Sequence, residues 1–223
     1  MYLEENRTKV KICGITKLED ARFASGALVD FLGFIFVENS PRYIKPEDAA
    51  EIIGWVEGPQ CVGVFADKKP GEINAISLET GLHMVQLHGD ETPEDCFNIS
   101  LPVIKAFRVK PDMNSSDILE MIRPYRDVAE YFLFDAWDQD MLGGTGKTFD
   151  WNILREIGED YPIILAGGIG PDNVRRAIKT VHPKAVDLSS KLELEPGIKD
   201  FDLIRDLMDE MQEIWELQEL DEL

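Results

Sequence analysis

The sequence predicts an α/β fold in which eight parallel strands alternate with helices and close into a single (βα)8 barrel. Eight short runs rich in Val, Ile and Phe recur along the 223 residues, with helical segments between them. The runs show no polar–apolar alternation, which is typical of parallel strands that are covered on both faces. Strand–helix units of roughly 20–30 residues leave no spare strand and no linker, and this favours a closed barrel.

Each element follows from its local sequence. The expected strands are residues 9–13, 31–37, 61–66, 83–88, 102–109, 131–136, 162–167 and 185–190. The clearest helical segments are residues 18–27, 46–56, 115–125, 149–158 and 171–181. Pro46 and Pro171 suit the first turns of helices, and Asp150 suits an N-cap position.

An acidic helix is expected from about residue 199 to the end of the chain. Residues 199–223 hold ten carboxylates and two basic side chains. The apolar side chains of this segment fall on one stripe, made up of Phe201, Ile204, Met208, Met211 and Trp215. We expect the acidic residues to form a solvated helix face rather than an interaction tail.

An open, doubly wound parallel sheet is the alternative architecture. Such a sheet normally carries its glycine motif directly after the first strand. Here the glycine-rich segments come late, at residues 143–146 and 167–170. We therefore interpret residues 1–223 as one barrel domain.

Composition limits the partners and the compartment. A formal net charge of −20 makes nucleic acid and anionic membranes poor partners. No apolar run approaches the length of a membrane span, and the first residues resemble neither a signal peptide nor a transit peptide. Cys13, Cys61 and Cys96, at unrelated spacings, suit the reducing cytoplasm. Without CxxC or HExxH and with only three histidines, no metal site is expected.

Residues 140–151, DMLGGTGKTFDW, end in a Gly-Lys-Thr that resembles a nucleotide-binding loop. The Walker pattern requires a glycine five places before Gly146, where this chain has Met141. The segment follows the sixth expected strand, so it is better interpreted as a loop that lines a phosphate-bearing ligand.

Barrel geometry predicts where the functional site lies. Sites of (βα)8 barrels form where the strands end, and the last two loops commonly bind phosphate through backbone amides. The polar residues at these ends are Cys13, Arg42, His88, Asp135, Asp187, Ser189 and Ser190. His88 is interpreted equally well as a rim residue or as a substrate contact, and a carboxylate such as Asp187 suits a substrate hydroxyl or amine rather than a phosphate.

The same residues lie in a series of short motifs. In order, these are KVKICGIT, LGFIFVENSPRYI, VGVF, VQLHGDE, VIKAF, GGTGKTFDW, ILAGGIGPDNV, and VDLSS followed by EPGIKD. The series, from about Lys9 to Asp200, resembles phosphoribosylanthranilate isomerase, a (βα)8 barrel of tryptophan biosynthesis. The resemblance implies an Amadori rearrangement of N-(5-phosphoribosyl)anthranilate to the 1-amino-2-ketose, without a cofactor.

The resemblance also assigns roles to single residues. It implies that Cys13 is the general base, that Asp135 is the general acid and that Arg42 binds the anthranilate carboxylate. The residues that it assigns to the phosphate are Gly144, Gly167, Gly168, Ser189 and Ser190. It leaves a monomer and a homodimer equally open.

One departure from the family pattern lies after the eighth strand. The family usually has Ser-Ser-Gly, whereas this chain has Ser189, Ser190 and Lys191. Lys191 either brings a cation to the phosphate or points to solvent, and the lost glycine could disturb a turn of positive φ.

Two other functions stay open at this stage. The related isomerase of histidine biosynthesis catalyses the same rearrangement but has an aspartate where Cys13 stands, so the cysteine argues against it. A non-catalytic barrel that binds a phosphate ligand is the other alternative, and the presence of both Cys13 and Asp135 argues against it.

Overall fold

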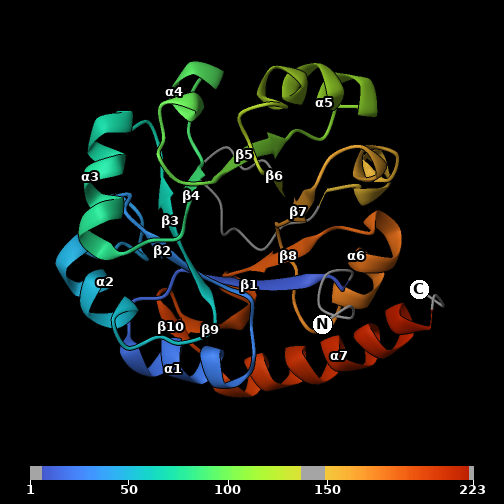
Figure 1. The fold of residues 1–223 in the computed structure, drawn as a ribbon. Helices are drawn as coiled ribbons and strands as arrows, with labels where there is room; N and C mark the ends of the chain where they lie inside the picture. Colours follow the sequence, from blue (N-terminus) through green and yellow to red (C-terminus); the bar gives the residue numbers. More distant parts are fainter. Residues whose placement is uncertain (1–6, 137–148, 221–223) are drawn as a thin grey trace.

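The computed structural model describes residues 7–136 and 149–220 of the chain. Within these ranges, eight parallel strands close into a barrel in chain order, with helices around the outside (Figure 1). The strands are β1 (Lys9–Cys13), β2 (Phe31–Ile35), β3 (Gln60–Phe65), β4 (Met84–Leu87), β5 (Val103–Val109), β6 (Tyr131–Ala136), β7 (Ile163–Leu165) and β8 (Ala185–Leu188). The predicted (βα)8 barrel is confirmed.

The helices largely follow the expected segments. They are α1 (Leu18–Gly26), α2 (Pro46–Ile53), α3 (Pro70–Thr80), α4 (Pro93–Phe97), α5 (Ser115–Ile122), α6 (Val174–Val181) and α7 (Phe201–Glu219). Pro46 occupies the first turn of α2 as predicted. None of the helices in the described part of the chain is both long and apolar enough to cross a membrane.

The prediction of an α-helix over residues 149–158 is wrong. This segment forms two short 3₁₀ turns, Trp151–Leu154 and Ile157–Glu159. Asp150 does cap the first turn, accepting a hydrogen bond from the backbone N–H of Asn152. The Ser115 hydroxyl of α5 donates a hydrogen bond to the Ile153 carbonyl, which would otherwise accept the i→i+4 bond of an α-helix.

The expectation of no spare strand is also wrong. After β8, the chain forms a two-stranded antiparallel hairpin, β9 (Glu193–Glu195) and β10 (Ile198–Lys199). Gly197 makes its turn with a φ of +85°. The hairpin is too short to show a strand pattern in the sequence, and its buried charged residues hide it further.

Alternation along the strands separates the inside of the barrel from its outer layer. The inside is filled by a compact apolar cluster of Phe31, Val62, Met84, Ile104, Ala106, Leu133, Ile164, Ala166 and Ala185. Because side chains repeat every second residue, the positions two places beyond Met84, Leu133 and Ala185 face the same interior. These positions hold Gln86, Asp135 and Asp187, so the mouth of the barrel is polar.

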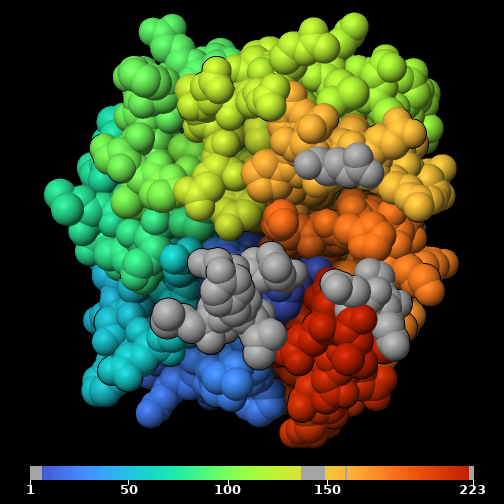
Figure 2. Space-filling model, turned by 45° about the vertical axis from the view of Figure 1, so that its right-hand side comes forward, coloured from blue at the N-terminus to red at the C-terminus, as the bar shows by residue number. Residues whose placement is uncertain are grey.

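Helix α7 closes the ring of helices between α6 and α1. Figure 1 shows it running beside α1, and in Figure 2 its red surface lies below the orange surface and beside the blue surface of the N-terminal part of the chain. Its buried side chains are Ile204, Leu207, Met211 and Ile214. Phe201, Met208 and Trp215, expected on the buried stripe, are half-buried at its margins. The predicted stripe is therefore rotated slightly but otherwise right.

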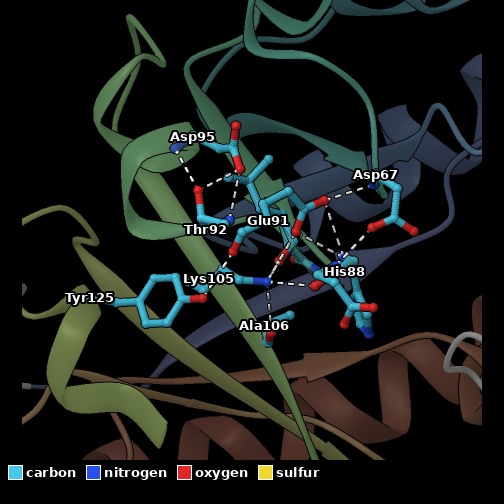
Figure 3. A network of polar contacts seen from close by, with 12 residues as sticks. Asp67, His88, Glu91, Thr92, Asp95, Lys105, Ala106 and Tyr125 are labelled. Carbon is cyan, nitrogen blue, oxygen red and sulfur yellow. Dashed lines mark hydrogen bonds and ion pairs between the residues drawn. The ribbon is translucent and has the colours of Figure 1, made fainter.

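A buried charged pair joins β5 to the loops that follow β3 and β4 (Figure 3). The Lys105 ammonium donates hydrogen bonds to the Glu91 carboxylate at 3.0 Å and to the Gly89 carbonyl at 2.7 Å. Glu91 also accepts hydrogen bonds from the backbone N–H groups of Asp67 and Gly89. Both side chains of the pair are 3% exposed, so their charges depend on these partners.

We expect Lys105→Met to lower the free energy of unfolding by about 3–5 kcal/mol, because it leaves the Glu91 charge buried without its cation. Urea denaturation at neutral pH measures this loss. The exposed Lys110 at the end of the same strand provides the control, and Lys110→Met should change stability very little. The double variant with Glu91→Gln should recover part of the loss. If Lys105→Met alone were as stable as wild type, the ion pair of Lys105 and Glu91 would not be needed for stability.

Candidate active site

A pocket of about 270 Å³ opens at the C-terminal ends of the strands. The residues of the predicted site that line it are Cys13, Arg42, His88, Asp135, Gly167, Gly168, Asp187, Ser189 and Ser190. Gly144 lies outside the described residues, as do Gly143 and Gly146. Residues from six different strand–loop units, far apart in the sequence, thus meet in one cavity.

Cys13 ends β1 and is 5% exposed. Burial raises the pKa of its thiol, while the positive charges of Lys11 and Lys199 act in the opposite direction. The neighbouring strand β2 has Gly33 beside it, where a Cβ atom would lie only 2.7 Å from the Cys13 Sγ. The glycine therefore makes room for the sulfur, and the raised pKa favours the protonated thiol at neutral pH.

Asp135 lies near the end of β6 and points into the same pocket. Burial, followed by the negative charge of Asp187, raises its pKa to about 7. At the end of β7, Gly167 has a φ of +87°, and a Cβ atom there would lie 2.9 Å from the Asp135 Oδ1. A carboxyl group that keeps its proton near neutral pH can act as a general acid.

Lys11 and Asp187 form an ion pair inside the barrel mouth. They are register partners on β1 and β8, and the Lys11 Nζ lies 2.9 Å from the Asp187 Oδ1. Burial alone would lower the pKa of Lys11, but the negative charge of Asp187 and the Cys13 thiol more than offset it and raise the pKa. Sequence reasoning missed Lys11, although a lysine inside a strand covered on both faces is the signal that could have found it.

Arg42 is held in place by the hairpin that follows β8. Its Nε and Nη2 groups donate hydrogen bonds to the Glu193 carboxylate at 2.9 and 2.7 Å. Glu193 accepts a further hydrogen bond from the Lys199 ammonium, which also bonds to the Cys13 carbonyl. Burial would raise the pKa of Glu193, but the bonds to Arg42 and the charge of Lys199 hold it below its usual value.

Sequence reasoning found Arg42 and missed its supports. Glu193 and Lys199 lie about 150 residues further along the chain, and their local sequence gives no sign of the contact. With 5% of its surface exposed, Arg42 is a fixed guanidinium at the pocket wall rather than an exposed loop arginine. Glu193 uses one edge of the fork, which leaves Nη1 on the other edge.

The loops after β7 and β8 form a further part of the pocket wall. Gly167 and Gly168 both have positive φ, and the Asn173 side chain fixes their loop through the Gly168 carbonyl and the Gly170 N–H. The buried Ser189 Oγ has no hydrogen-bond partner among the described residues. Exposed backbone amides and an unpaired hydroxyl are the groups that bind an anion.

Lys191 lines the pocket without backbone strain. It lies in the 3₁₀ turn Ser190–Leu192 and is not among the residues with positive φ. The expected disturbance of a glycine turn is therefore wrong, because the chain continues here in a conformation open to any residue. The Lys191 Cβ packs next to Gly170, and the residue as a whole is exposed at the edge of the pocket.

Comparison with known proteins identifies the family. A family model described as N-(5'-phosphoribosyl)anthranilate (PRA) isomerase matches residues 10–210. The chain belongs to the phosphoribosylanthranilate isomerase family. The resemblance drawn from the motifs is confirmed.

Within the described residues, no group of three or more His, Cys, Asp and Glu side chains is arranged to hold a metal ion.

Relatives within the phosphoribosylanthranilate isomerase family match over nearly the whole chain. The enzyme of Geobacter sulfurreducens is 48% identical over 201 residues, which is 90% of this chain and 96% of the relative. The crystal structure of the Thermotoga maritima enzyme is 39% identical, with a TM-score of 0.84 over 92% of this chain and 99% of the other.

Two further structures concern ligand and assembly. A phosphoribosylanthranilate isomerase in complex with reduced 1-(o-carboxyphenylamino)-1-deoxyribulose 5-phosphate is 37% identical, covers 92% of this chain and has a TM-score of 0.81. Another Thermotoga maritima structure is of monomers generated from a dimeric enzyme.

The raised pKa of Asp135 predicts a pH-dependent stability. The carboxyl has a usual pKa of 3.8 and a pKa of about 7 in the folded chain. Between pH 3.8 and about pH 7 the folded chain therefore retains this proton, whereas the unfolded chain has lost it. The protonated group contributes its full stability to the fold below pH 3.8, and this contribution is lost as the pH rises to about 7. We expect Asp135→Asn to be more stable than wild type, by a margin that grows over this range and then levels off.

Thermal denaturation from pH 4 to pH 8 measures this margin. Asp112→Asn, at an exposed carboxylate, is the matched control and should not raise stability anywhere in the range. A margin for Asp135→Asn that is the same at every pH would contradict the raised pKa.

Proposed function

We propose that the chain converts N-(5'-phosphoribosyl)anthranilate to 1-(2-carboxyphenylamino)-1-deoxyribulose 5-phosphate in this pocket, as a cofactor-free step of tryptophan biosynthesis. The observation that carries the proposal is the pairing, in one cavity, of a carboxyl group with a pKa of about 7 and a buried thiol. Family membership supplies the reaction, and the positions of these groups supply their roles.

Asp135 starts the reaction as the general acid. Its proton goes to the ribose ring oxygen, and the bond between that oxygen and C1 breaks. The lone pair of the anthranilate nitrogen forms the double bond to C1, which gives an iminium ion and leaves Asp135 as a carboxylate. The pKa of about 7 suits this transfer, because the proton is present near neutral pH and is not held too tightly.

Cys13 acts next as the general base. Its thiolate removes the proton from C2, and the electron pair of the C–H bond forms a C1–C2 double bond while the iminium nitrogen becomes neutral. Burial raises the pKa of the thiol, so Cys13 releases its proton to solvent when the substrate binds and takes one up again after the product leaves. The iminium charge adds to that of Lys11 and Lys199 and favours the thiolate in between. The proton then returns from Cys13 to C1, and the C2 hydroxyl gives its proton back to Asp135, which forms the ketone.

The remaining pocket residues bind the two anionic ends of the substrate. Arg42 receives the anthranilate carboxylate on the edge of its guanidinium that Glu193 does not use. The phosphate lies on Gly167, Gly168, Ser189 and Ser190, and Gly144 joins them by family motif. Asp187, already paired to Lys11, accepts a hydrogen bond from a substrate hydroxyl.

The free cysteines fit a cytoplasmic location.

The decisive experiment follows the fluorescence of freshly prepared phosphoribosylanthranilate. Wild type should consume it, whereas Cys13→Ser and Asp135→Asn should each lower kcat by about 10²-fold or more, as expected for a lost general base or acid. Both variants should keep KM and the folded state, as judged by circular dichroism. Binding without consumption by wild type would contradict the proposal, and near-full kcat in either variant would contradict the role of that residue.

Arg42 offers a separate test of binding. We expect Arg42→Lys to raise KM about tenfold or more with a small change in kcat, because lysine keeps the charge but loses the fork that Glu193 aligns. Steady-state kinetics measure both constants. Lys45→Ala is the control, since this exposed lysine in the same loop lies outside the pocket. An unchanged KM in Arg42→Lys would show that Arg42 does not bind the carboxylate.

A further inference from the structure

His88 stands opposite the acid in the pocket and has no role in the reaction described above. It follows β4 directly, and its side chain is 11% exposed. Its Nε2 lies 3.7 Å from the Asp135 Oδ2, slightly beyond hydrogen-bond distance. This Nε2 is buried and has no hydrogen-bond partner among the described residues.

The other ring nitrogen of His88 is occupied. Its Nδ1 lies 3.0 Å from the Nε2 of Gln86, a residue that is 1% exposed and faces the same interior from β4. An amide nitrogen carries hydrogens and donates, so Nδ1 accepts this bond. The ring proton of a neutral imidazole then stands on Nε2, directed at Asp135.

The backbone of His88 is fixed on both sides. Its N–H donates to the Phe65 carbonyl, and its carbonyl accepts a hydrogen bond from the Arg108 Nη2 at 2.9 Å. The next residue, Gly89, is bound by Lys105, whose network Figure 3 draws beside His88. With the backbone fixed, the bond from Gln86 to Nδ1 and the burial of the side chain limit rotation of the ring.

The surroundings keep the imidazole uncharged. Burial lowers the pKa of His88 to about 3, and the positive charges of Arg108, Lys105 and Lys11 act in the same direction. At neutral pH the ring therefore does not compete with Asp135 as the acid. What it offers is one N–H donor.

We propose that Gln86 and His88 are positioning residues for the acid: Gln86 fixes the Nε2–H tautomer of His88, which stabilises the Asp135 carboxylate formed when its proton leaves. The inference rests on the proposed role of Asp135. The contact shortens only as negative charge develops on Asp135, so it favours the transition state over the bound substrate. The proton on Nε2 stays there throughout.

The tautomer can be read directly, without activity. In the ¹⁵N-histidine-labelled protein free of substrate, two-bond ¹H–¹⁵N spectra from about pH 6 to 8 should show His88 as the neutral Nε2–H form. The chain has three histidines, and the signal lost in His88→Gln assigns it. Gln86→Met should give a mixture of tautomers. An Nδ1–H form or an imidazolium in wild type would overturn the proposal.

Kinetics test the donor itself. We expect His88→Leu to lower kcat about tenfold with KM within about twofold, and His88→Gln, whose amide keeps an N–H group, to recover most of the loss. Gln86→Met alone should lower kcat relative to wild type, but adding it to His88→Gln should lower kcat little further. Equal losses in His88→Leu and His88→Gln would overturn the donor role.

Two other outcomes are distinguishable from this one. A raised KM with unchanged kcat in His88→Leu would mean a substrate contact and would also overturn the proposal. Full kcat in Asp135→Asn would mean that the proposed acid is wrong. In that case the tautomer measured by NMR still reports on Gln86, so the two failures are separate.

Discussion

The buried ion pair of Lys11 and Asp187 acts on both Cys13 and Asp135, the two titratable groups on which the proposed chemistry depends. Its two members are neighbours across the seam where β1 meets β8 and closes the barrel. The negative charge of Asp187 helps to raise the pKa of Asp135, and the positive charge of Lys11 opposes the effect of burial on Cys13. One pair thus acts on the proposed acid and on the proposed base in opposite directions.

Such a pocket is costly for the fold, because it leaves polar atoms buried without partners. The Ser189 Oγ and the His88 Nε2 are examples among the described residues. Their support comes from charged pairs at the rim of the barrel. Lys105 with Glu91 holds the loops after β3 and β4, and Arg42 with Glu193 joins the loop after β2 to the hairpin after β8. The stabilising contacts lie around the pocket, and the reactive groups within it stay free for a ligand.

The sequence predicted the barrel well because its signal is repeated and local. Each strand run is long enough to be recognised, and seven of the eight contained their strand, while β3 begins one residue before its run. The α-helix predicted over residues 149–158 is replaced by two 3₁₀ turns, where the Ser115 hydroxyl of α5 binds the Ile153 carbonyl, a contact with no local trace. The hairpin at residues 193–199 failed because its strands are short and its buried residues are charged. Periodicity registers neither the long-range contact of Ser115 nor the short, charged strands of the hairpin.

By itself the sequence determined that eight strands close into a barrel, and that Cys13, Arg42, Asp135 and the residues near Gly167 and Ser189 meet at its mouth. The barrel follows from the alternation of strands and helices along the chain, and the site follows from the rule that the C-terminal ends of the strands meet at one face of the barrel. Only the tertiary structure decided the state of these groups. The pKa of Asp135, the pairing of Lys11, the anchoring of Arg42 by Glu193 and the tautomer-fixing contact of Gln86 depend on burial and on distances between segments far apart in the chain. Electrostatic energies follow those distances and the loss of water around each charge, and neither can be read from the order of residues.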